Sequence, residues 1–168
     1  MCGAISTLAA IHAGGLWAQT WPTKSVRYVI PFDPGASPDI VGRTIADRLT
    51  RMWGQQVIVE NRVGAAGTLG AAYVARQAPD GYTLLQGNIA SNAIAVSLFA
   101  KLPYDQMRDF APITRIGLTP NVIMVHPSTP FRTVKDLADY AKAHPGQLSY
   151  SASLAGTSPH LTMELLKL

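Results

Sequence analysis

The feature that most constrains the fold is a regular alternation, from residue 20 onward, between short β-rich runs and segments of helical spacing. The first β-rich run covers residues 25–31 and precedes a predicted helix at residues 39–53. Two further runs, residues 56–60 and 82–86, flank a helix of small residues predicted at 69–78. Parallel strands need such crossover connections, so the pattern is typical of a mainly parallel sheet covered by helices. The sequence therefore predicts an α/β fold.

The alternation continues in the last third of the chain. Three more strands are predicted there, at residues 110–116, 121–126 and 148–151. A helix is predicted at residues 134–143, where Thr133 and Asp136 have the spacing of a capping box. A final helix is predicted from about residue 159. These elements indicate a second α/β unit.

The pattern divides the chain into four regions. We predict a signal peptide at residues 1–18, a first α/β lobe at 19–104, a crossing segment at 105–116 and the start of a second lobe at 117–168. A parallel strand needs neighbours, and an apolar helix needs a partner surface. We therefore expect the second lobe to be incomplete and the fold to be truncated.

The N-terminal region is distinguished by the absence of charge. Its first 18 residues contain no Asp, Glu, Lys or Arg and carry an apolar run at residues 4–17. This run is too short to span a bilayer, and the chain becomes polar after Ala18. These properties predict a secretory signal and export, with a buried N-terminal helix as the alternative.

Composition narrows the classes of function. Hydrophobic residues make up 48% of the chain and charged residues 14%, which favours a folded core over disorder. The formal net charge is +4, but Lys and Arg are scattered singly, so we expect no nucleic-acid partner. Cys2 is the single cysteine, and the four histidines lack metal-ligand spacing. We expect no metal and no cofactor.

Two predicted strand-to-helix loops have features of an anion-binding site. In residues 32–39, Gly35 lets the backbone approach a ligand, and Ser37 before Pro38 suits the cap of a helix whose N-terminus attracts anions. Residues 153–160 repeat the device, with a central glycine and a Ser-Pro pair before His160. The alternatives are plain capped helices and a histidine that only packs near a helix start.

Nucleotide-binding and catalytic motifs are not matched. Gly64, Gly67 and Gly70 do not form a dinucleotide fingerprint or a P-loop, so we predict that they allow a helix to pack closely on the sheet. The sequence contains no G-x-S-x-G elbow and no H-E-x-x-H motif. A hydrolytic set including Ser37 and His160 remains an alternative.

Short motifs spread over residues 21–168 carry a family resemblance. They include Trp21-Pro22-Thr23-Lys24, Val59-Glu60-Asn61-Arg62, Pro79-Asp80-Gly81-Tyr82-Thr83-Leu84, Asp109-Phe110, Tyr140-Ala141-Lys142 and His160-Leu161. Together these motifs resemble the N-terminal half of the Bug, or TctC-type, periplasmic solute receptors of tripartite tricarboxylate transport systems.

The resemblance implies a two-lobed, Venus-flytrap receptor in the periplasm of a Gram-negative bacterium, with no enzymatic activity. It implies a small carboxylate ligand, such as a dicarboxylate, a tricarboxylate, an amino acid or an aromatic acid, and a membrane transporter as partner. The implied ligand contacts come from the two loops above and the loop after the third strand. They are Phe32, Pro34, Gly35, Ala36, Ser37, Asp39, Asn88, Ser91, Ser153, Gly156, Thr157, Ser158 and His160.

The chain also departs from the family pattern at four loop positions. The family prefers a small neutral residue at Asp33, glycine at Ala36 and Leu154, and a residue other than proline at Pro38. Two alternatives to a receptor are a non-functional gene remnant and a fragment of an α/β hydrolase that uses Ser37 and His160.

Overall fold

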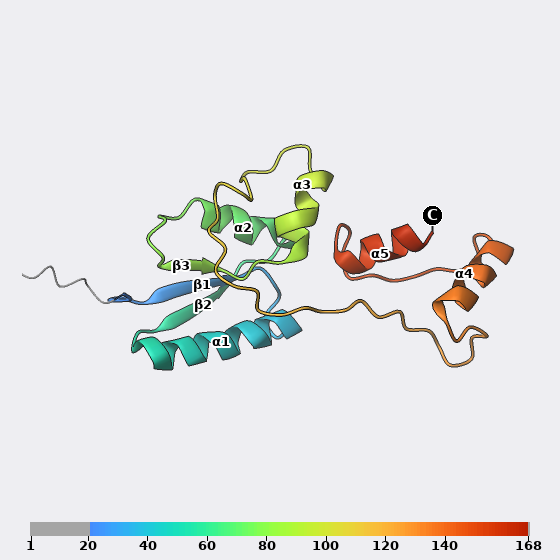
Figure 1. Cartoon of the computed structure of the whole chain (residues 1–168), viewed down its shortest axis with the longest axis horizontal. Coiled ribbons are helices and arrows are strands. Elements are labelled where there is room, and N and C mark those ends of the chain that lie inside the picture. Colours follow the sequence, from blue (N-terminus) through green and yellow to red (C-terminus); the bar gives the residue numbers. More distant parts are fainter. Residues whose placement is uncertain (1–20, 168) are drawn as a thin grey trace, which may run out of the picture.

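The computed structural model describes residues 21–167, which form two parts: a sheet unit (residues 21–110) and a C-terminal segment (residues 111–167). Figure 1 shows the C-terminal segment extending to the right of the sheet unit. The signal peptide predicted at residues 1–18 lies outside the described residues. Within the described range, no helix combines the length and apolar character needed to cross a membrane.

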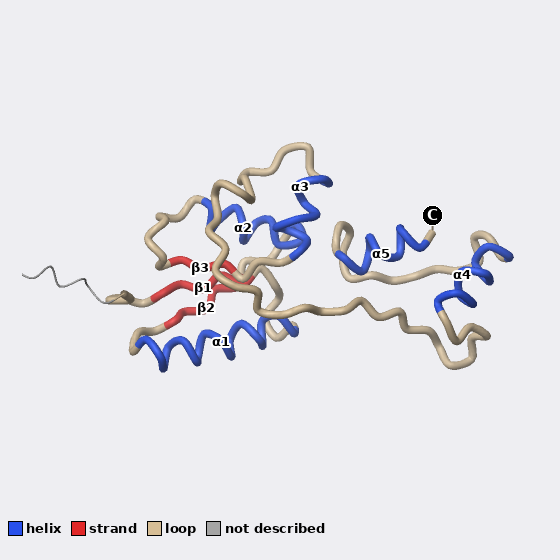
Figure 2. The backbone as a smooth tube through the Cα atoms, in the orientation of Figure 1, coloured by secondary structure: helices blue, strands red, loops and turns tan. Residues whose placement is uncertain are grey.

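Three parallel strands form the sheet, in the order β2-β1-β3. They are β1 (Val26–Ile30), β2 (Val57–Asn61) and β3 (Thr83–Leu85), drawn red in Figure 2. Tyr28 in the central strand lies opposite Val59 in β2 and Leu84 in β3. The α/β prediction is confirmed, and the three strands predicted here differ from the observed ones by one residue at their ends.

Helices α1 (Ser37–Trp53) and α2 (Thr68–Ala75) cover opposite faces of this sheet (Figure 1). Alternate residues of β1 point to opposite faces, so Val26, Tyr28 and Ile30 pack together with Ala46 of α1. A second cluster contains Ala71 and Ala72 of α2, Tyr104 and the partly buried Leu85 and Phe110. The candidate loop at residues 32–39 and the loop after β3 leave the carboxyl ends of strands that lie between these two layers.

The glycines around the start of α2 allow the close packing that the sequence predicted. They belong to η1 (Ala65–Gly67), a short 3-10 helix, and to the first turn of α2. A Cβ on Gly70 would lie 2.9 Å from Pro31 Cβ and 3.0 Å from the Arg62 carbonyl oxygen. Gly67 has a φ of +92°, and a Cβ there would lie 2.6 Å from Asn88 Nδ2. These contacts confirm close packing at Gly67 and Gly70, whereas a Cβ on Gly64 would meet only the Leu69 side chain.

After β3 the chain forms η2 (Ala90–Ile94), a π-helical turn, and α3 (Ala95–Leu98). Tyr104 then returns to the sheet unit, where its hydroxyl donates to the Ser91 carbonyl at 2.6 Å. Its ring packs edge-on against Phe110, with the ring centroids 5.7 Å apart. The sheet unit therefore includes residues up to Phe110.

The C-terminal segment contains helices α4 (Val134–Ala143) and α5 (Ser158–Leu166) but no strand among its described residues. The helix predicted at residues 134–143 and its capping box are confirmed. The strands predicted at residues 110–116, 121–126 and 148–151 are wrong. A strand needs neighbouring strands to satisfy its backbone, and residues 111–126 instead run extended and exposed.

Candidate functional site

The β1 loop (residues 32–39) connects the carboxyl end of β1 to α1 through a tight turn. Ala36 N–H donates to the Asp33 carbonyl at 3.1 Å, and Gly35 between them has a φ of +82°. A positive φ at the third position of a four-residue turn suits glycine, as in a type II turn. The turn leads the chain from the carboxyl end of the central strand β1 directly into the first turn of α1.

Ser37 does not cap α1, so the prediction from its place before Pro38 is wrong. Ala36 is the N-cap residue, and Ser37 is the first helical residue, with an exposed side chain. The helix therefore starts one residue earlier in the sequence than predicted, because Ile40 N–H already donates to the Ala36 carbonyl at 3.0 Å. The Ser37 hydroxyl is consequently left at the surface.

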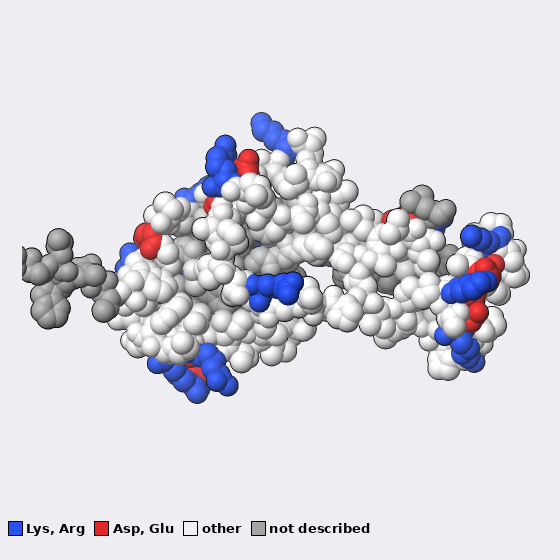
Figure 3. Space-filling view, viewed as in Figure 1, with Lys and Arg blue, Asp and Glu red and all other residues white. Residues whose placement is uncertain are grey.

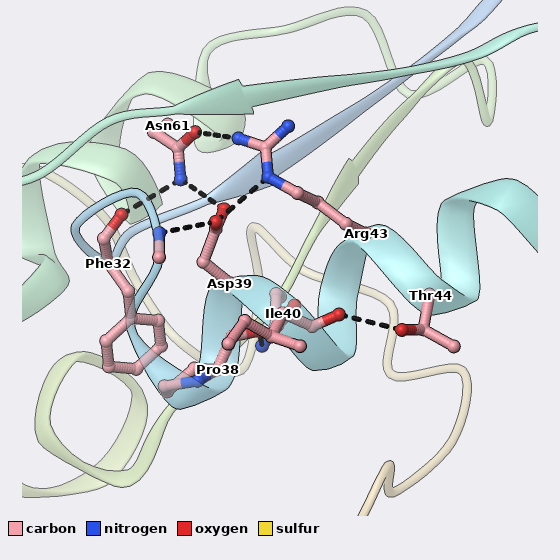
Figure 4. Close-up of polar contacts among 9 residues, drawn as sticks. Phe32, Pro38, Asp39, Ile40, Arg43, Thr44 and Asn61 are labelled. Atoms are coloured by element: carbon pink, nitrogen blue, oxygen red, sulfur yellow. Dashed lines mark hydrogen bonds and ion pairs between the residues drawn. The ribbon is translucent and has the colours of Figure 1, made fainter.

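Asp39 is buried at the base of this loop, with 1% of its surface exposed (Figure 4). Its Oδ2 accepts from Gly35 N–H at 2.8 Å and from Arg43 Nε at 2.9 Å, while its Oδ1 accepts from Asn61 Nδ2 at 2.7 Å. Asn61 also donates to the Phe32 carbonyl at 3.0 Å. The hydrogen bond from Arg43, followed by those from Asn61 and Gly35, lowers the pKa of Asp39 to about 2.

Both carboxylate oxygens of Asp39, a residue for which the resemblance implied a ligand contact, therefore accept hydrogen bonds from within the protein. Arg43 and Asn61 were missed as parts of the site. Their signals were the i, i+4 spacing of Asp39 and Arg43 on α1 and the place of Asn61 at the end of β2, the strand beside β1. These hydrogen bonds connect the β1 loop to α1 through Arg43 and to β2 through Asn61.

The first turn of α1 keeps two backbone donors that bond to no acceptor within the described structure, the N–H groups of Ser37 and Asp39. Pro38 between them has no N–H to donate. The N-terminus of a helix carries a partial positive charge, so these two amides can receive the oxygen of an anion. Phe32 packs on the core beneath, while Pro34 is exposed at the outer edge of the loop.

The β3 loop (residues 87–91) lies next to the β1 loop at the same end of the sheet. Gln86, at the end of β3, connects them, because its Nε2 donates to the Pro38 carbonyl at 2.9 Å. Ser91 is fully buried, and its hydroxyl donates to Asn92 Oδ1 at 2.6 Å. Asn88 Oδ1 accepts from Ser91 N–H at 3.0 Å, while Asn88 Nδ2 is buried without a hydrogen-bond partner. The Ser91 side chain thus stabilises the β3 loop from inside.

The α5 loop (residues 153–160) forms a turn of the same kind before α5. Thr157 N–H donates to the Leu154 carbonyl at 3.2 Å, and the buried Gly156 has a φ of +78°. Thr157 is the N-cap residue and Ser158 the first helical residue, so the predicted cap is again one residue too late. The reason is the same, because Leu161 N–H already donates to the Thr157 carbonyl at 3.0 Å.

Side chains of the α5 loop bond mostly to the loop itself and to the C-terminal segment. Thr157 Oγ1 donates to the Leu154 carbonyl at 2.6 Å and lies 3.2 Å from Ser153 Oγ. Ser158 Oγ accepts from Asn121 Nδ2 at 2.7 Å. The amides of Ser158 and His160 bond to no acceptor within the described residues, as at the start of α1.

The structure brings the β1 and β3 loops together but does not join them to the α5 loop by a hydrogen bond between described residues. The α5 loop meets the sheet unit through Gly156, where an added Cβ would lie 2.7 Å from Leu98 Cδ1 of α3. Two pockets, of about 140 and 290 Å³, lie beside α4.

The hydrolytic alternative is not assembled in this arrangement. No hydrogen bond among residues 21–167 connects Ser37 to His160, and His160 Nδ1 instead accepts from Gly156 N–H at 3.4 Å. The described residues also contain no group of His, Cys, Asp and Glu that could bind a metal ion. On the face shown in Figure 3, basic side chains lie in several small groups, some of them beside acidic side chains, and form no continuous basic surface.

Comparison with known proteins shows the family to which the chain is similar. A family model described as "Tripartite tricarboxylate transporter family receptor" matches residues 41–168. The protein BugT of Bordetella pertussis is 35% identical over 152 residues, which cover 90% of this chain and 47% of BugT. A protein from the gbd 5′ region of Cupriavidus necator is 35% identical over 168 residues, covering 98% of this chain and 51% of its own.

Solved structures give the same result. An R. palustris protein with adipate matches with a TM-score of 0.78 and 38% identity, covering 88% of this chain and 49% of its own. MatC of Rhodopseudomonas palustris with bound malate matches with a TM-score of 0.74 and 33% identity, covering 88% and 52%. This chain spans about half the length of the curated relatives and solved proteins that it matches.

Proposed function

This chain belongs to the tripartite tricarboxylate transporter receptor family, and from that premise we propose that it binds a small carboxylate as part of a periplasmic solute receptor. The ligand oxygens bind to the free amides at the start of α1 and α5. The receptor leaves the ligand chemically unchanged and delivers it to the membrane subunits of a transporter. Residues 1–18 act as the signal for export.

One observation carries the proposal: two loops that lead into a helix, one after β1 and one before α5, each leave two amides unpaired at the N-terminus of that helix. Backbone N–H groups and the helix dipole attract a carboxylate, so a site built from them needs few charged side chains to bind one. Adipate and malate, the ligands named with two of the matched structures, are both dicarboxylates. A ligand with a carboxylate at each end could bind one loop at each end.

The domain organisation is part of the proposal. We assign the first lobe to the sheet unit and the second lobe to the C-terminal segment, with the ligand between them. The boundary that best fits the packing is near Phe110, because Phe110 still packs against the α2 cluster. The crossing segment then begins after Phe110.

A proline substitution tests the amide contacts directly. Ser37→Pro removes the amide donor at the first helical position, where proline is well tolerated, and the extended Ala36 before it suits a following proline. Ser158→Pro does the same in α5, after the extended Thr157. Loss of a charge-assisted hydrogen bond should weaken binding of adipate or malate by about tenfold in isothermal titration calorimetry.

The matched controls are Ser37→Ala and Ser158→Ala, which remove the hydroxyl and keep the amide. We expect these variants to weaken binding less than the proline variants. Proline variants that melt like the parent chain and bind as tightly as the alanine variants would contradict the proposed contacts.

A further inference from the structure

The β1 loop and the α5 loop have the same backbone design in two parts of the chain. Their glycines have φ values of +82° and +78°, and the turn hydrogen bonds around them measure 3.1 and 3.2 Å. The first helical hydrogen bond measures 3.0 Å in both α1 and α5. Position by position, Gly35 corresponds to Gly156 and Asp39 to His160. The sequences between them, Ala-Ser-Pro and Thr-Ser-Pro, differ in one residue.

The correspondence extends to an unusual side-chain contact. In each loop the glycine N–H donates to the side chain of the residue four positions later, in the first turn of the helix. The Gly35 N–H donates to Asp39 Oδ2 at 2.8 Å, and the Gly156 N–H donates to His160 Nδ1 at 3.4 Å. A carboxylate oxygen and an imidazole nitrogen thus occupy equivalent places in the two loops.

We propose that Asp39 and His160 are equivalent positioning residues, each of which fixes the glycine amide of its loop so that the helix amides beside it stay free for the ligand. This inference rests on the proposed function, because the free amides are its ligand contacts. It assigns the ligand contacts of these two residues to their backbone amides. The carboxylate and the ring shape the loop and do not touch the ligand.

The two positioning residues differ in how firmly they are themselves placed. Asp39 is buried and bonded to Arg43 and Asn61, which belong to different elements. His160 is partly exposed, and its Nε2 lies 3.9 Å from Glu164 Oε1 on the next turn of α5. The contact from His160 is also longer. We therefore expect the β1 loop to be held more firmly than the α5 loop.

Amide hydrogen exchange of the whole 168-residue chain, followed by NMR, tests the proposal without any ligand. In His160→Ala, exchange of the Gly156 amide should become about fivefold faster, the change expected for the loss of one ordinary hydrogen bond. In His160→Asn, the asparagine Oδ1 takes the place of Nδ1, so slow exchange should be kept. The Gln86 amide, which bonds to Val29 in the sheet, reports on general loosening.

The same design applies to the β1 loop with Asp39→Ala and Asp39→Asn. Asp39→Ala should accelerate Gly35 exchange more than His160→Ala accelerates Gly156 exchange, because it also removes the acceptor of Arg43 and Asn61. Asp39→Asn keeps one acceptor oxygen and should restore part of the protection. If Asp39→Ala does not fold, the comparison of His160→Ala with His160→Asn alone tests the positioning role.

A ligand measurement separates this inference from the proposed function. With malate and adipate as probes, His160→Ala should weaken binding by about fivefold and His160→Asn should bind close to the parent chain. The positioning role would be overturned if the parent chain binds the probes and the parent, His160→Ala and His160→Asn chains have the same Gly156 exchange rate or the same affinity. If the parent chain binds neither probe but exchange responds as expected, the proposed function fails and the positioning of the glycine amides stands.

Discussion

The sheet unit and the C-terminal segment have similar elements in their sequences but reach very different degrees of burial. In the sheet unit, β1 lies between two strands and two helices, and Val26, Val29 and Ile30 are completely buried. In the C-terminal segment, Phe131 is the one buried hydrophobic residue of the described part, while Ile113 and Met124 are 79% and 88% exposed. The comparison shows which structures need distant partners and which form locally.

Helices and capped turns form in both parts, because their hydrogen bonds connect residues close in sequence. The capping box of α4 is complete although α4 has no buried residue. Among residues 21–167, strands form only in the sheet unit, where neighbouring strands supply the hydrogen-bonding partners. The two candidate loops illustrate the same rule, since each is a local turn whose bonds span a few residues.

The largest expected effect compares isoleucines in the two parts. Ile30 of β1 is buried against Gly42 of α1, so Ile30→Ala should lower the free energy of unfolding by about 3 kcal/mol. Ile113→Ala, its matched control in the C-terminal segment, should change it by less than about 0.5 kcal/mol. Urea denaturation followed by circular dichroism measures both. Equal losses would show that the exposed segment packs in solution.

A smaller effect concerns acid. The pKa of Asp39 is lowered from its ordinary value of 3.8 to about 2, so the unfolded chain binds a proton at higher pH than the folded chain. The stabilising contribution of Asp39 is therefore fully present above pH 3.8 and is lost as the pH falls through about 2. Urea unfolding between pH 7 and pH 2 should show this loss in the parent chain and a weaker one in Asp39→Asn.

Asp47→Asn is the control for that measurement. Asp47 forms an exposed pair with Arg51 on the same helix, and such pairs contribute little. The free energy of unfolding of Asp47→Asn should therefore fall with pH in the same way as that of the parent chain. Parallel curves for the parent chain and Asp39→Asn would mean that the buried network does not stabilise the sheet unit.

The smallest effect tests local structure in the C-terminal segment. Thr133 Oγ1 accepts from Asp136 N–H at 3.1 Å, so Thr133→Ala should destabilise α4 by about 1 kcal/mol. Exchange of the α4 amides should accelerate, while those of the β1 ladder stay as they are. Thr133→Ser, which keeps the hydroxyl, is the matched control. Acceleration in the sheet as well would show that the two parts unfold together.

The sequence determined the features that depend on near neighbours. Hydrophobic spacing located β1, β2, β3 and α1, and the Thr133 and Asp136 spacing located the start of α4. The glycines of the β1 and α5 loops marked turns that the structure contains. These features follow from φ preferences and hydrogen bonds that span a few residues.

Tertiary structure decided what depends on distant neighbours. Residues 121–126 have the composition of a strand, yet the described structure gives them no strand to pair with. The partners of the Asp39 carboxylate, Asn61 from β2 and Arg43 from α1, could be identified only in the fold. A residue's chemistry is visible in the sequence, but its acceptors and donors are assigned only when the chain folds and brings remote segments together.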